Sequence, residues 1–216
     1  MHYTPLLQDH NLPHDPMLAL VVPRPIGWIS TVNSDGIVNL APYSFFNLLS
    51  GRPPYVMFSS NGYKDSQRNA EATGEFVCNV ATYDLREAVD LSSAPLEPHF
   101  SEPTLLGLEM APSVKVQVPR VARSPGALEC RYLQTVELPG LNGKPNASMV
   151  IGEVISVYVD DDVLVNGMVD LHRVRPITRL GYLDYGALGE IWSSPRPDAE
   201  MLVARAAALG TKDAAK

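Results

Sequence analysis

The chain has 216 residues, with 17 Lys and Arg against 24 Asp and Glu, so its formal charge at pH 7 is −7. This balance excludes most nucleic-acid-binding proteins, because a sequence-independent grip on a phosphate backbone needs a basic stripe. Hydrophobic residues make up 45% and charged residues 19% of the chain, which excludes a disordered protein and indicates a globular one.

Prolines and glycines divide the chain into short elements. The 19 Pro and 15 Gly predict an all-β or α+β domain with many turns rather than a helix bundle. After a proline-containing arm at residues 1–16, residues 17–33 are rich in Val, Ile and Trp and predict a strand entered through a rigid extended segment. The Asn-Ser-Asp-Gly turn at 33–36 joins this strand to an apolar run at 37–50, which predicts a β-hairpin.

A strand, a polar loop and a helix come next. Residues 54–60 predict a third strand. Beyond the loop, Asp65 or Ser66 is suited to cap a short helix and Gly74 to close it. The helix N-terminus therefore follows the strand at 54–60 after one polar loop. Residues 75–80 then predict another strand.

The middle of the chain is less regular. Residues 82–91 predict a second helix, because Asp84 and Glu87 stand at capping-box spacing. Residues 92–125 are rich in proline and show no clear period. A stretch this long is uncommon in a compact domain unless it packs over a site or an interface.

The last part of the chain begins with two long β-type runs. Residues 127–138 and 147–160 predict an antiparallel pair of strands. The tail at 198–216 is rich in alanine and predicts a helix that frays at its end. We therefore expect a single domain over residues 1–216, mainly β with peripheral helices.

The two cysteines bear on metal binding, and the N-terminus bears on the cell compartment. Cys78 and Cys130 lie inside apolar runs without the spacing of a metal site, so they predict buried core thiols and no metal centre. Residues 1–16 lack the basic and apolar regions of a signal peptide, and no stretch reaches the roughly 18 apolar residues of a membrane span. We expect a cytoplasmic protein that binds neither nucleic acid nor membrane.

Two constellations are candidates for a ligand site. The first is the helix N-terminus near residue 65, which comes with the hydroxyls of Ser59, Ser60 and Ser66 and the cations Lys64 and Arg68. Unpaired backbone N–H groups, hydroxyls and positive charge suit one bound phosphate. A capped surface helix with solvated charges explains the same residues.

The second constellation is the hairpin at 26–47. Small polar residues alternate there with large apolar ones, and the polar members are Ser30, Thr31, Asn39, Ser44 and Asn47. A flat aromatic ligand with an edge of donors and acceptors needs such a lining. A half-buried sheet with one polar face is the alternative.

Four motifs of the chain resemble the flavin reductase-like, FMN-binding split-barrel family, and the resemblance covers residues 17–192. These motifs are PRPIGWISTVNSDGIVNLAPYSFFN, KDSQRNAEATGEFVCNV, SPGALECR and RPITRLGYLDYGALGE. This family contains flavoredoxins and the reductase components of two-component flavin monooxygenases. The resemblance implies a six-stranded antiparallel split β-barrel of Greek-key topology that binds FMN, usually at a homodimer interface.

The resemblance also assigns residues. The positions that match those around the isoalloxazine ring and ribityl chain are Ser30, Thr31, Asn39, Ala41, Pro42, Tyr43, Ser44, Phe45 and Asn47. The positions that match the phosphate loop are Ser59, Ser60, Lys64 and Ser66. Arg24 is explained as well by a salt bridge or a cap at the barrel mouth, and Trp28 and Phe45 suit the core as well as ring stacking.

Residues near the C-terminus correspond to a region that approaches the flavin in related proteins, often from the partner subunit: His172, Arg179, Tyr182 and Tyr185. His172 and Tyr182 are therefore candidate catalytic residues. A surface or structural histidine and tyrosines that plug the barrel are the alternatives.

The function that the resemblance implies is an FMN-binding oxidoreductase. It would be an NAD(P)H-dependent flavin reductase, with NADH or NADPH as a transient co-substrate and a monooxygenase or other redox protein as a partner. A flavoredoxin-like electron carrier without NAD(P)H activity and a non-enzymatic flavin-binding module are the alternatives. The sequence has no GxGxxG, so it does not support a Rossmann dinucleotide site.

Overall fold

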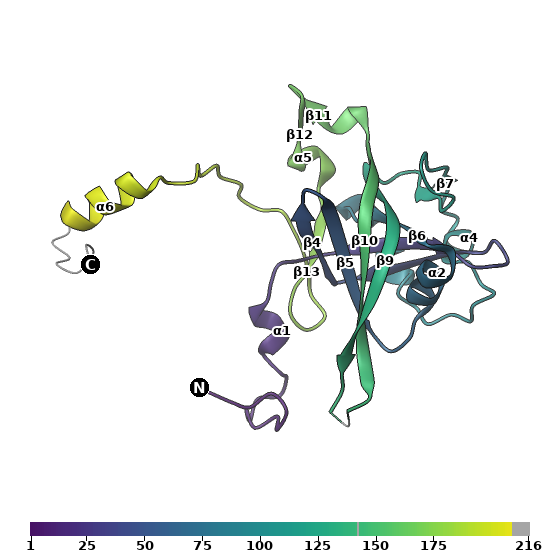
Figure 1. Ribbon diagram of the computed structural model, residues 1–216, viewed down its shortest axis with the longest axis horizontal. Helices are drawn as coiled ribbons and strands as arrows, with labels where there is room; N and C mark the ends of the chain where they lie inside the picture. Colours follow the sequence, from purple (N-terminus) through teal and green to yellow (C-terminus); the bar gives the residue numbers. More distant parts are fainter. Residues whose placement is uncertain (142, 209–216) are drawn as a thin grey trace.

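Antiparallel strands form the body of the molecule (Figure 1). The computed structural model describes residues 1–141 and 143–208. One seven-stranded sheet has the strand order β3-β2-β6-β9-β10-β5-β4. Its strands are β2 (Gly27–Val32), β3 (Val38–Tyr43), β4 (Phe45–Gly51), β5 (Pro54–Asn61), β6 (Glu75–Val80), β9 (Gly126–Pro139) and β10 (Pro145–Val159).

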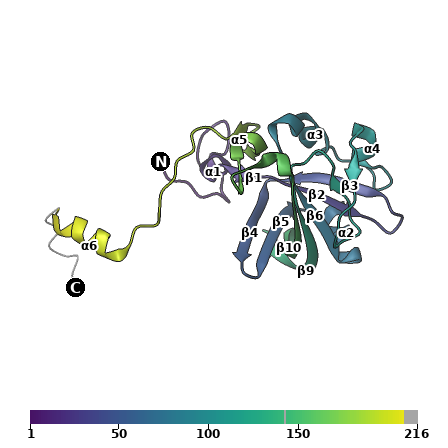
Figure 2. The same cartoon turned by 90° about the horizontal axis from the view of Figure 1, so that it is seen from above.

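The two edges of this sheet meet at a single residue. Strand β3 ends at Tyr43 and β4 begins at Phe45, yet these strands stand at opposite ends of the strand order. The sheet must therefore curl until its edges are one residue apart, and Figure 2 shows β4 and β5 running at a steep angle to β2 and β3. Because β3 and β4 do not pair, the barrel remains split at Ser44.

The predicted fold class is confirmed. The sheet has seven strands where six were expected, because the apolar run at 37–50 breaks into β3 and β4 at Ser44. The predicted hairpin is present, with β2 antiparallel to β3 and the Gly36 N–H donating to the Asn33 carbonyl at 3.1 Å. The predicted pair of long strands is present as β9 and β10.

The remaining elements are short. A second sheet has the order β1-β13-β14 and is built from β1 (Arg24–Pro25), β13 (Ile177–Arg179) and β14 (Tyr185–Ala187). Two further pairs are β7 (Met110–Ala111) with β8 (Arg120–Val121), and β11 (Leu164–Val165) with β12 (Met168–Val169). The helices are α1 (Met17–Leu20), α2 (Asp65–Thr73), α3 (Arg86–Leu91), α4 (Glu102–Leu106), α5 (Leu171–Val174) and α6 (Ala199–Ala208).

Three local predictions differ from the structure. Residues 17–33 form α1, β1 and β2 instead of one strand, because the Arg24 guanidinium donates to the carbonyls of Leu18 and Val21 and folds the start of the segment inward. The capping box at 82–91 is absent: Tyr83–Leu85 form a 3-10 turn, α3 starts at Arg86, and the Asp84 carboxylate accepts from Arg175 instead.

The third difference concerns the start of α2. Its N-cap is Lys64, which makes no side-chain cap, whereas the Asp65 carboxylate pairs with Arg68 and Ser66 bonds to Asn39. The end of the helix is as predicted, since Gly74 has a φ of 76° and its N–H donates to the Ala70 carbonyl. A residue without a side chain adopts this left-handed conformation at little cost.

Three apolar clusters are buried in the molecule, and two of them hold these layers together. One lies inside the curled sheet and includes Ile29, Phe58 and Phe76. The other lies between the sheet and helix α3 and includes Trp28 and Val89. Cys78 and Cys130 are both buried in the first cluster with free thiols, as predicted.

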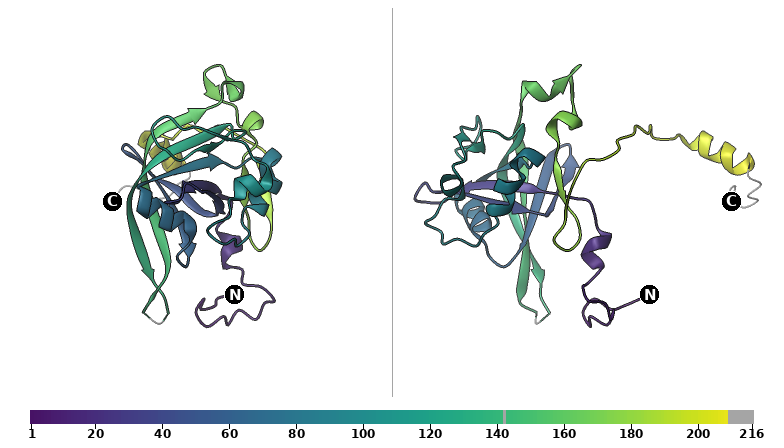
Figure 3. Two further views of the ribbon diagram at one scale, coloured as in Figure 1. Left: turned by 90° about the vertical axis from the view of Figure 1, so that its right-hand side faces the viewer. Right: turned by 180° about the vertical axis from the view of Figure 1, so that it is seen from behind.

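The two ends of the chain leave this body. Figure 3 shows the N-terminal residues and the segment leading to α6 extending away from it in different directions. The tail helix was predicted from residue 198, and the structure has it at Ala199–Ala208, while residues 209–216 lie outside the described chain. In the described residues, no helix combines the length and the apolar character that crossing a bilayer requires.

Close packing at Gly152 gives a test of the barrel core. A Cβ at this position would lie 2.4 Å from the Phe76 ring, whereas a Cβ at Gly51 would meet nothing within 4 Å. We expect Gly152→Ala to lower the free energy of unfolding by about 1–3 kcal/mol, the usual cost of overpacking. Gly51→Ala is the control and should change it by no more than about 0.5 kcal/mol. Equal urea midpoints for the two variants would contradict this packing.

Candidate functional site

A pocket of about 490 Å³ lies where the split barrel meets the start of α2. The lining of this pocket comes from β3, the start of β4, the end of β5, the first residues of α2 and the loop after α3. Its residues are Asn39, Ala41, Pro42, Tyr43, Ser44, Phe45, Ser59, Ser60, Asn61, Lys64, Asp65, Ser66, Ser92, Ser93, Ala94, Pro95, Leu96 and Glu102.

The structure brings together most of the residues that the sequence proposed for a cofactor. Both candidate constellations contribute to this one pocket, the hairpin through β3 and β4 and the phosphate loop through β5 and α2. The proposed residues in its lining are Asn39, Ala41, Pro42, Tyr43, Ser44, Phe45, Ser59, Ser60, Lys64 and Ser66. Because alternate residues of a strand share a face, Asn39, Ala41 and Tyr43 point to one side of β3.

Three proposed residues lie outside this lining. Ser30 is fully buried, where its Oγ donates to the Pro119 carbonyl at 2.7 Å and accepts from Asn79 at 3.2 Å. Thr31 is also fully buried, and its Oγ1 accepts from Asn69 at 3.2 Å. Asn47 is exposed on β4, and its Oδ1 accepts from the Leu48 N–H.

The end of the pocket at α2 is organised around one buried hydroxyl. The Asn39 Nδ2 donates to the Ser66 Oγ at 2.9 Å, which ties strand β3 to the first turn of α2. Burial raises the pKa of the neighbouring Tyr43 hydroxyl to about 12, against a hydrogen bond with Ser66 that lowers it. Tyr43 therefore stays protonated and neutral at physiological pH.

The positive charge at this end of the pocket comes from one side chain, that of Lys64. Lys64 is exposed at the pocket, while Arg68 is not part of the lining and pairs with Asp65. Of the two cations that the sequence proposed, only the Lys64 ammonium therefore faces the pocket. The Ser59, Ser60 and Ser66 hydroxyls and the N-terminus of α2 lie beside it. Such a site suits one anionic group.

Sequence reasoning missed the opposite wall of the pocket. This wall belongs to residues 92–125, which we call the covering segment, and it contributes Ser92–Leu96 and Glu102. The Trp28 Nε1 donates to the Ser92 Oγ at 2.9 Å and holds the start of the segment. Only the unusual length of this irregular stretch signalled it, as a segment that should pack over a site.

Glu102 fastens the far end of that wall. Its Oε2 accepts from the Leu40 N–H of the edge strand β3 at 2.9 Å, and the residue is buried. Burial raises the pKa of this carboxyl, because a low-dielectric surrounding disfavours the charged form, and the nearby Asp65 carboxylate adds to the rise.

The candidate catalytic residues of the C-terminal region lie away from this pocket within one chain. His172 is exposed near the start of α5, where its N–H donates to the Asp170 carboxylate. The Tyr182 ring packs against His14 with 5.7 Å between centroids, and Arg179 lies over the Tyr185 ring. Their roles stay predictions.

Within the described part of the chain, Arg24 forms no salt bridge, and it is not part of the pocket lining. Its guanidinium is buried and donates to the carbonyls of Leu18, Val21 and Leu180. It also lies 6.0 Å from the centroid of the Phe45 ring. Arg24 therefore acts as a cap at the barrel mouth, joining α1 to the β13–β14 hairpin behind one ring of the pocket.

Comparison with known proteins agrees with this geometry. The model of the flavin reductase like domain matches residues 18–178. An uncharacterized protein from Halalkalibacterium halodurans is 39% identical over 186 residues, which cover 84% of this chain and 89% of that protein.

Two solved structures are also similar. Nitrilotriacetate monooxygenase component B from Bacillus cereus has a TM-score of 0.83 and 28% identity, covering 90% of this chain and 98% of that one. Flavoredoxin of Desulfovibrio vulgaris (Miyazaki F) has a TM-score of 0.73 and 22% identity, covering 81% and 91%, which shows a shared fold.

Glu102 makes stability depend on pH in a defined direction. Its pKa is higher in the folded chain than the ordinary value of 4.5, so folding favours the proton at this group. The contribution of Glu102 to stability is therefore full below that value and is lost as the pH rises through the folded pKa. We expect the free energy of unfolding of Glu102→Gln, relative to the native chain, to increase between about pH 4 and about pH 7. Urea unfolding at both pH values measures it, and a difference that is constant or decreases would contradict the burial of this carboxyl.

Proposed function

The chain belongs to the flavin reductase-like domain family, and on that basis we propose that it is an FMN-dependent oxidoreductase that reduces flavin with NADH or NADPH. The observation that carries the proposal is the convergence in one pocket of residues that the resemblance assigns to the ring and to the phosphate of a flavin nucleotide. The pocket therefore has one region suited to the flavin ring and another suited to the phosphate.

The residues of the pocket fit FMN. At one end, Lys64 and the hydroxyls beside the N-terminus of α2 would hold a phosphate. Along β3 and the start of β4, the apolar faces of Ala41, Pro42 and Phe45 would contact a flat ring. The hydroxyl and amide groups between these ends suit the polyol chain that joins the ring to the phosphate.

The protein's part in the reaction is binding and orientation. When bound, the flavin would supply the hydride-accepting centre, so the chain needs no nucleophile of its own. Tyr43 is neutral, and the buried bond between Asn39 and Ser66 fixes the strand and helix that form the site. Such preorganisation keeps the reacting groups at a constant geometry.

A transfer of reduced flavin to a second protein is consistent with the relatives. The similar Bacillus cereus protein is named as component B of nitrilotriacetate monooxygenase. We propose that this chain supplies electrons to a monooxygenase or another redox protein.

The second candidate is an electron carrier without NAD(P)H activity. The likeness in fold to a flavoredoxin favours it, and the same pocket would serve both functions. The two differ in whether a nicotinamide can reach the bound flavin and reduce it.

Reduction under anaerobic conditions separates these candidates. We expect the flavin absorbance of the FMN-loaded chain to bleach within seconds of adding NADH or NADPH, because hydride transfer between stacked rings is fast. Bleaching by dithionite but by neither nicotinamide would support the carrier. A chain that takes up no added FMN would overturn the proposal as a whole.

The phosphate end is tested by the side chain of Lys64. We expect Lys64→Gln to weaken FMN binding about tenfold or more, the effect of losing one hydrogen bond to a charged group. Riboflavin, which has no phosphate, should bind both forms equally. Lys115→Gln, which removes an exposed lysine outside the pocket lining, is the control. An equal loss for FMN and riboflavin would place the phosphate elsewhere.

A further inference from the structure

A short loop at residues 62–64, which we call the lysine loop, carries Lys64 to the candidate flavin pocket. It joins the end of β5 to the start of α2. At one end, the Gly62 N–H donates to the Asn146 carbonyl of β10 at 2.8 Å. At the other end, the Lys64 carbonyl accepts from the Arg68 N–H at 3.0 Å. The Tyr63 side chain between them is 60% exposed, so packing in a core does not fix it.

One carboxylate supplies a further contact for this loop. The Tyr63 hydroxyl donates to the Glu71 Oε2 at 2.8 Å. Glu71 lies on α2, about two helical turns beyond Lys64. The bond, which we call the loop clamp, therefore ties the middle of the lysine loop back onto the helix that follows it.

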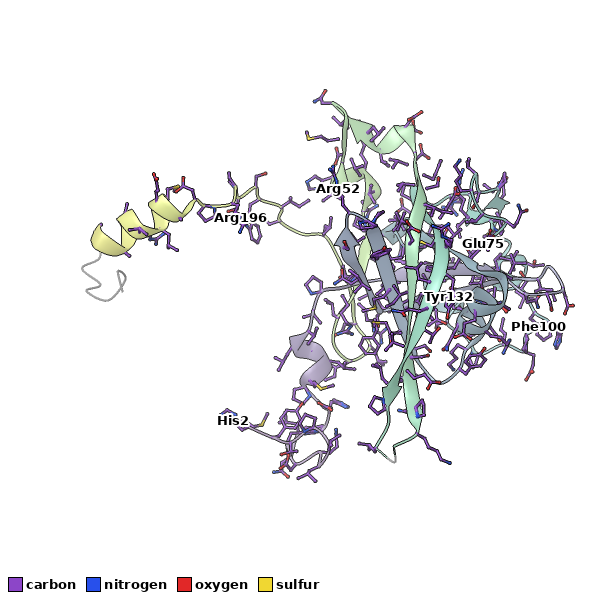
Figure 4. All side chains as sticks on the ribbon, viewed as in Figure 1. His2, Arg52, Glu75, Phe100, Tyr132 and Arg196 are labelled. Carbon is purple, nitrogen blue, oxygen red and sulfur yellow. The ribbon has the colours of Figure 1, made fainter. Side chains whose placement is uncertain are left out.

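The other oxygen of this carboxylate is anchored to the barrel. The Glu71 Oε1 accepts from the Thr135 Oγ1 of β9 at 2.7 Å and from the Gln67 Nε2 at 2.9 Å. Gln67 is buried, and its Oε1 accepts from the Ser148 hydroxyl of β10. Tyr132 stands on β9 (Figure 4), and its hydroxyl lies 3.0 Å from the Thr135 Oγ1. Glu71 thus connects an exposed loop to two strands of the barrel.

These bonds also fix the protonation states of the clamp. Burial alone would raise the pKa of Glu71, but the hydrogen bonds that the carboxylate accepts, that from Thr135 first, lower it below the ordinary value of 4.5. The bond to Glu71 raises the pKa of the Tyr63 hydroxyl above its ordinary value of 10.0. At physiological pH, an ionised carboxylate therefore accepts from a protonated phenol, which is the stronger kind of hydrogen bond.

The place of Glu71 is unfavourable for direct electrostatics. A carboxylate near the start of α2 repels a phosphate bound there, so its charge by itself would weaken such binding. Its bonds have the opposite effect, because they hold the loop that carries Lys64. The ammonium of a lysine stands on a flexible four-carbon stem, so its position depends on where the backbone below it is held.

We propose that the loop clamp holds Lys64 in place for the phosphate, so that Glu71 helps to set the preference of the pocket for a phosphorylated flavin. The inference rests on the proposed function of this pocket. In the described part of the chain, neither Tyr63 nor Glu71 lines the pocket. Both are therefore positioning residues, which act on the ligand through Lys64.

Two substitutions break the clamp in different ways. Tyr63→Phe removes the hydroxyl and changes no charge, whereas Glu71→Met removes the carboxylate with a side chain of similar length that suits a helix. We expect each to weaken FMN binding about three- to tenfold, the change that corresponds to one hydrogen bond, and to leave riboflavin binding unchanged. Titration of each variant with both flavins, followed by flavin fluorescence, measures these affinities.

Glu137→Met is the matched control. Glu137 is exposed on β9 and lines a small pocket together with Tyr63 and Gln67, but it is not part of the clamp. The variant removes the same charge from the same side of the molecule, so it should bind FMN as tightly as the native chain or slightly more tightly. Tighter FMN binding by Glu71→Met as well would show that Glu71 acts by repulsion, and the proposal would be wrong.

A double variant tests whether the clamp acts through Lys64. In a chain that already carries Lys64→Gln, we expect Glu71→Met to lower the FMN affinity by less than about twofold, because the side chain that the clamp positions is gone. Fully additive losses would overturn the proposal. Equal losses for FMN and riboflavin would do so too, since they indicate a general disturbance of the fold.

Hydrogen exchange of the flavin-free chain tests the clamp apart from the function of the pocket. We expect Tyr63→Phe to raise the exchange rate of the Gly62 N–H at least about threefold, because the loop opens more often without its side-chain bond. Normal FMN binding together with an unchanged exchange rate would overturn the clamp alone. A native chain that binds no FMN would overturn the proposed function and the flavin preference together.

Discussion

Buried polar side chains of the barrel hold the covering segment in place, and the pocket depends on this. The covering segment has little regular structure, so its backbone groups need partners from elsewhere. The barrel supplies them: Ser30 to the Pro119 carbonyl, Asn79 to the Val121 N–H, and Glu129 to the N–H groups of Val114 and Lys115. An unpaired buried group costs about 1–3 kcal/mol, so these bonds fix one arrangement of the wall.

The split at Ser44 has a related consequence. In a closed barrel, β3 and β4 would pair and use each other's backbone groups. Here the two strands diverge from one residue, and both line the pocket at that point. The opening therefore combines apolar side chains with the hydroxyl and amide groups of the same strands, which is the mixture that an aromatic ring with a polar edge requires. The Leu40 N–H at this edge of β3 is bonded by Glu102 and not by a neighbouring strand.

Local patterns were enough to predict much of this structure. Some features depend only on neighbouring residues: the alternation in β9 and β10, the turn before β3 and the glycine that ends α2. The Ser59, Ser60 and Ser66 hydroxyls at the pocket were likewise predicted from a short stretch of sequence. Ser30 has the same local pattern as Asn39, yet it serves the covering segment 89 residues away. Asp84 likewise has a cap's spacing but bonds to Arg175. These choices depend on partners that are distant in sequence, which no local pattern records.

The two cysteines have a practical consequence. Cys78 and Cys130 are buried among apolar side chains, and burial raises the pKa of the Cys130 thiol well above its ordinary value. Maleimides and other alkylating reagents attack an accessible thiolate, which the folded chain does not offer at these positions. A cysteine introduced on the surface would thus be the sole labelling site, and fluorophores or spin labels could be attached without first replacing native residues.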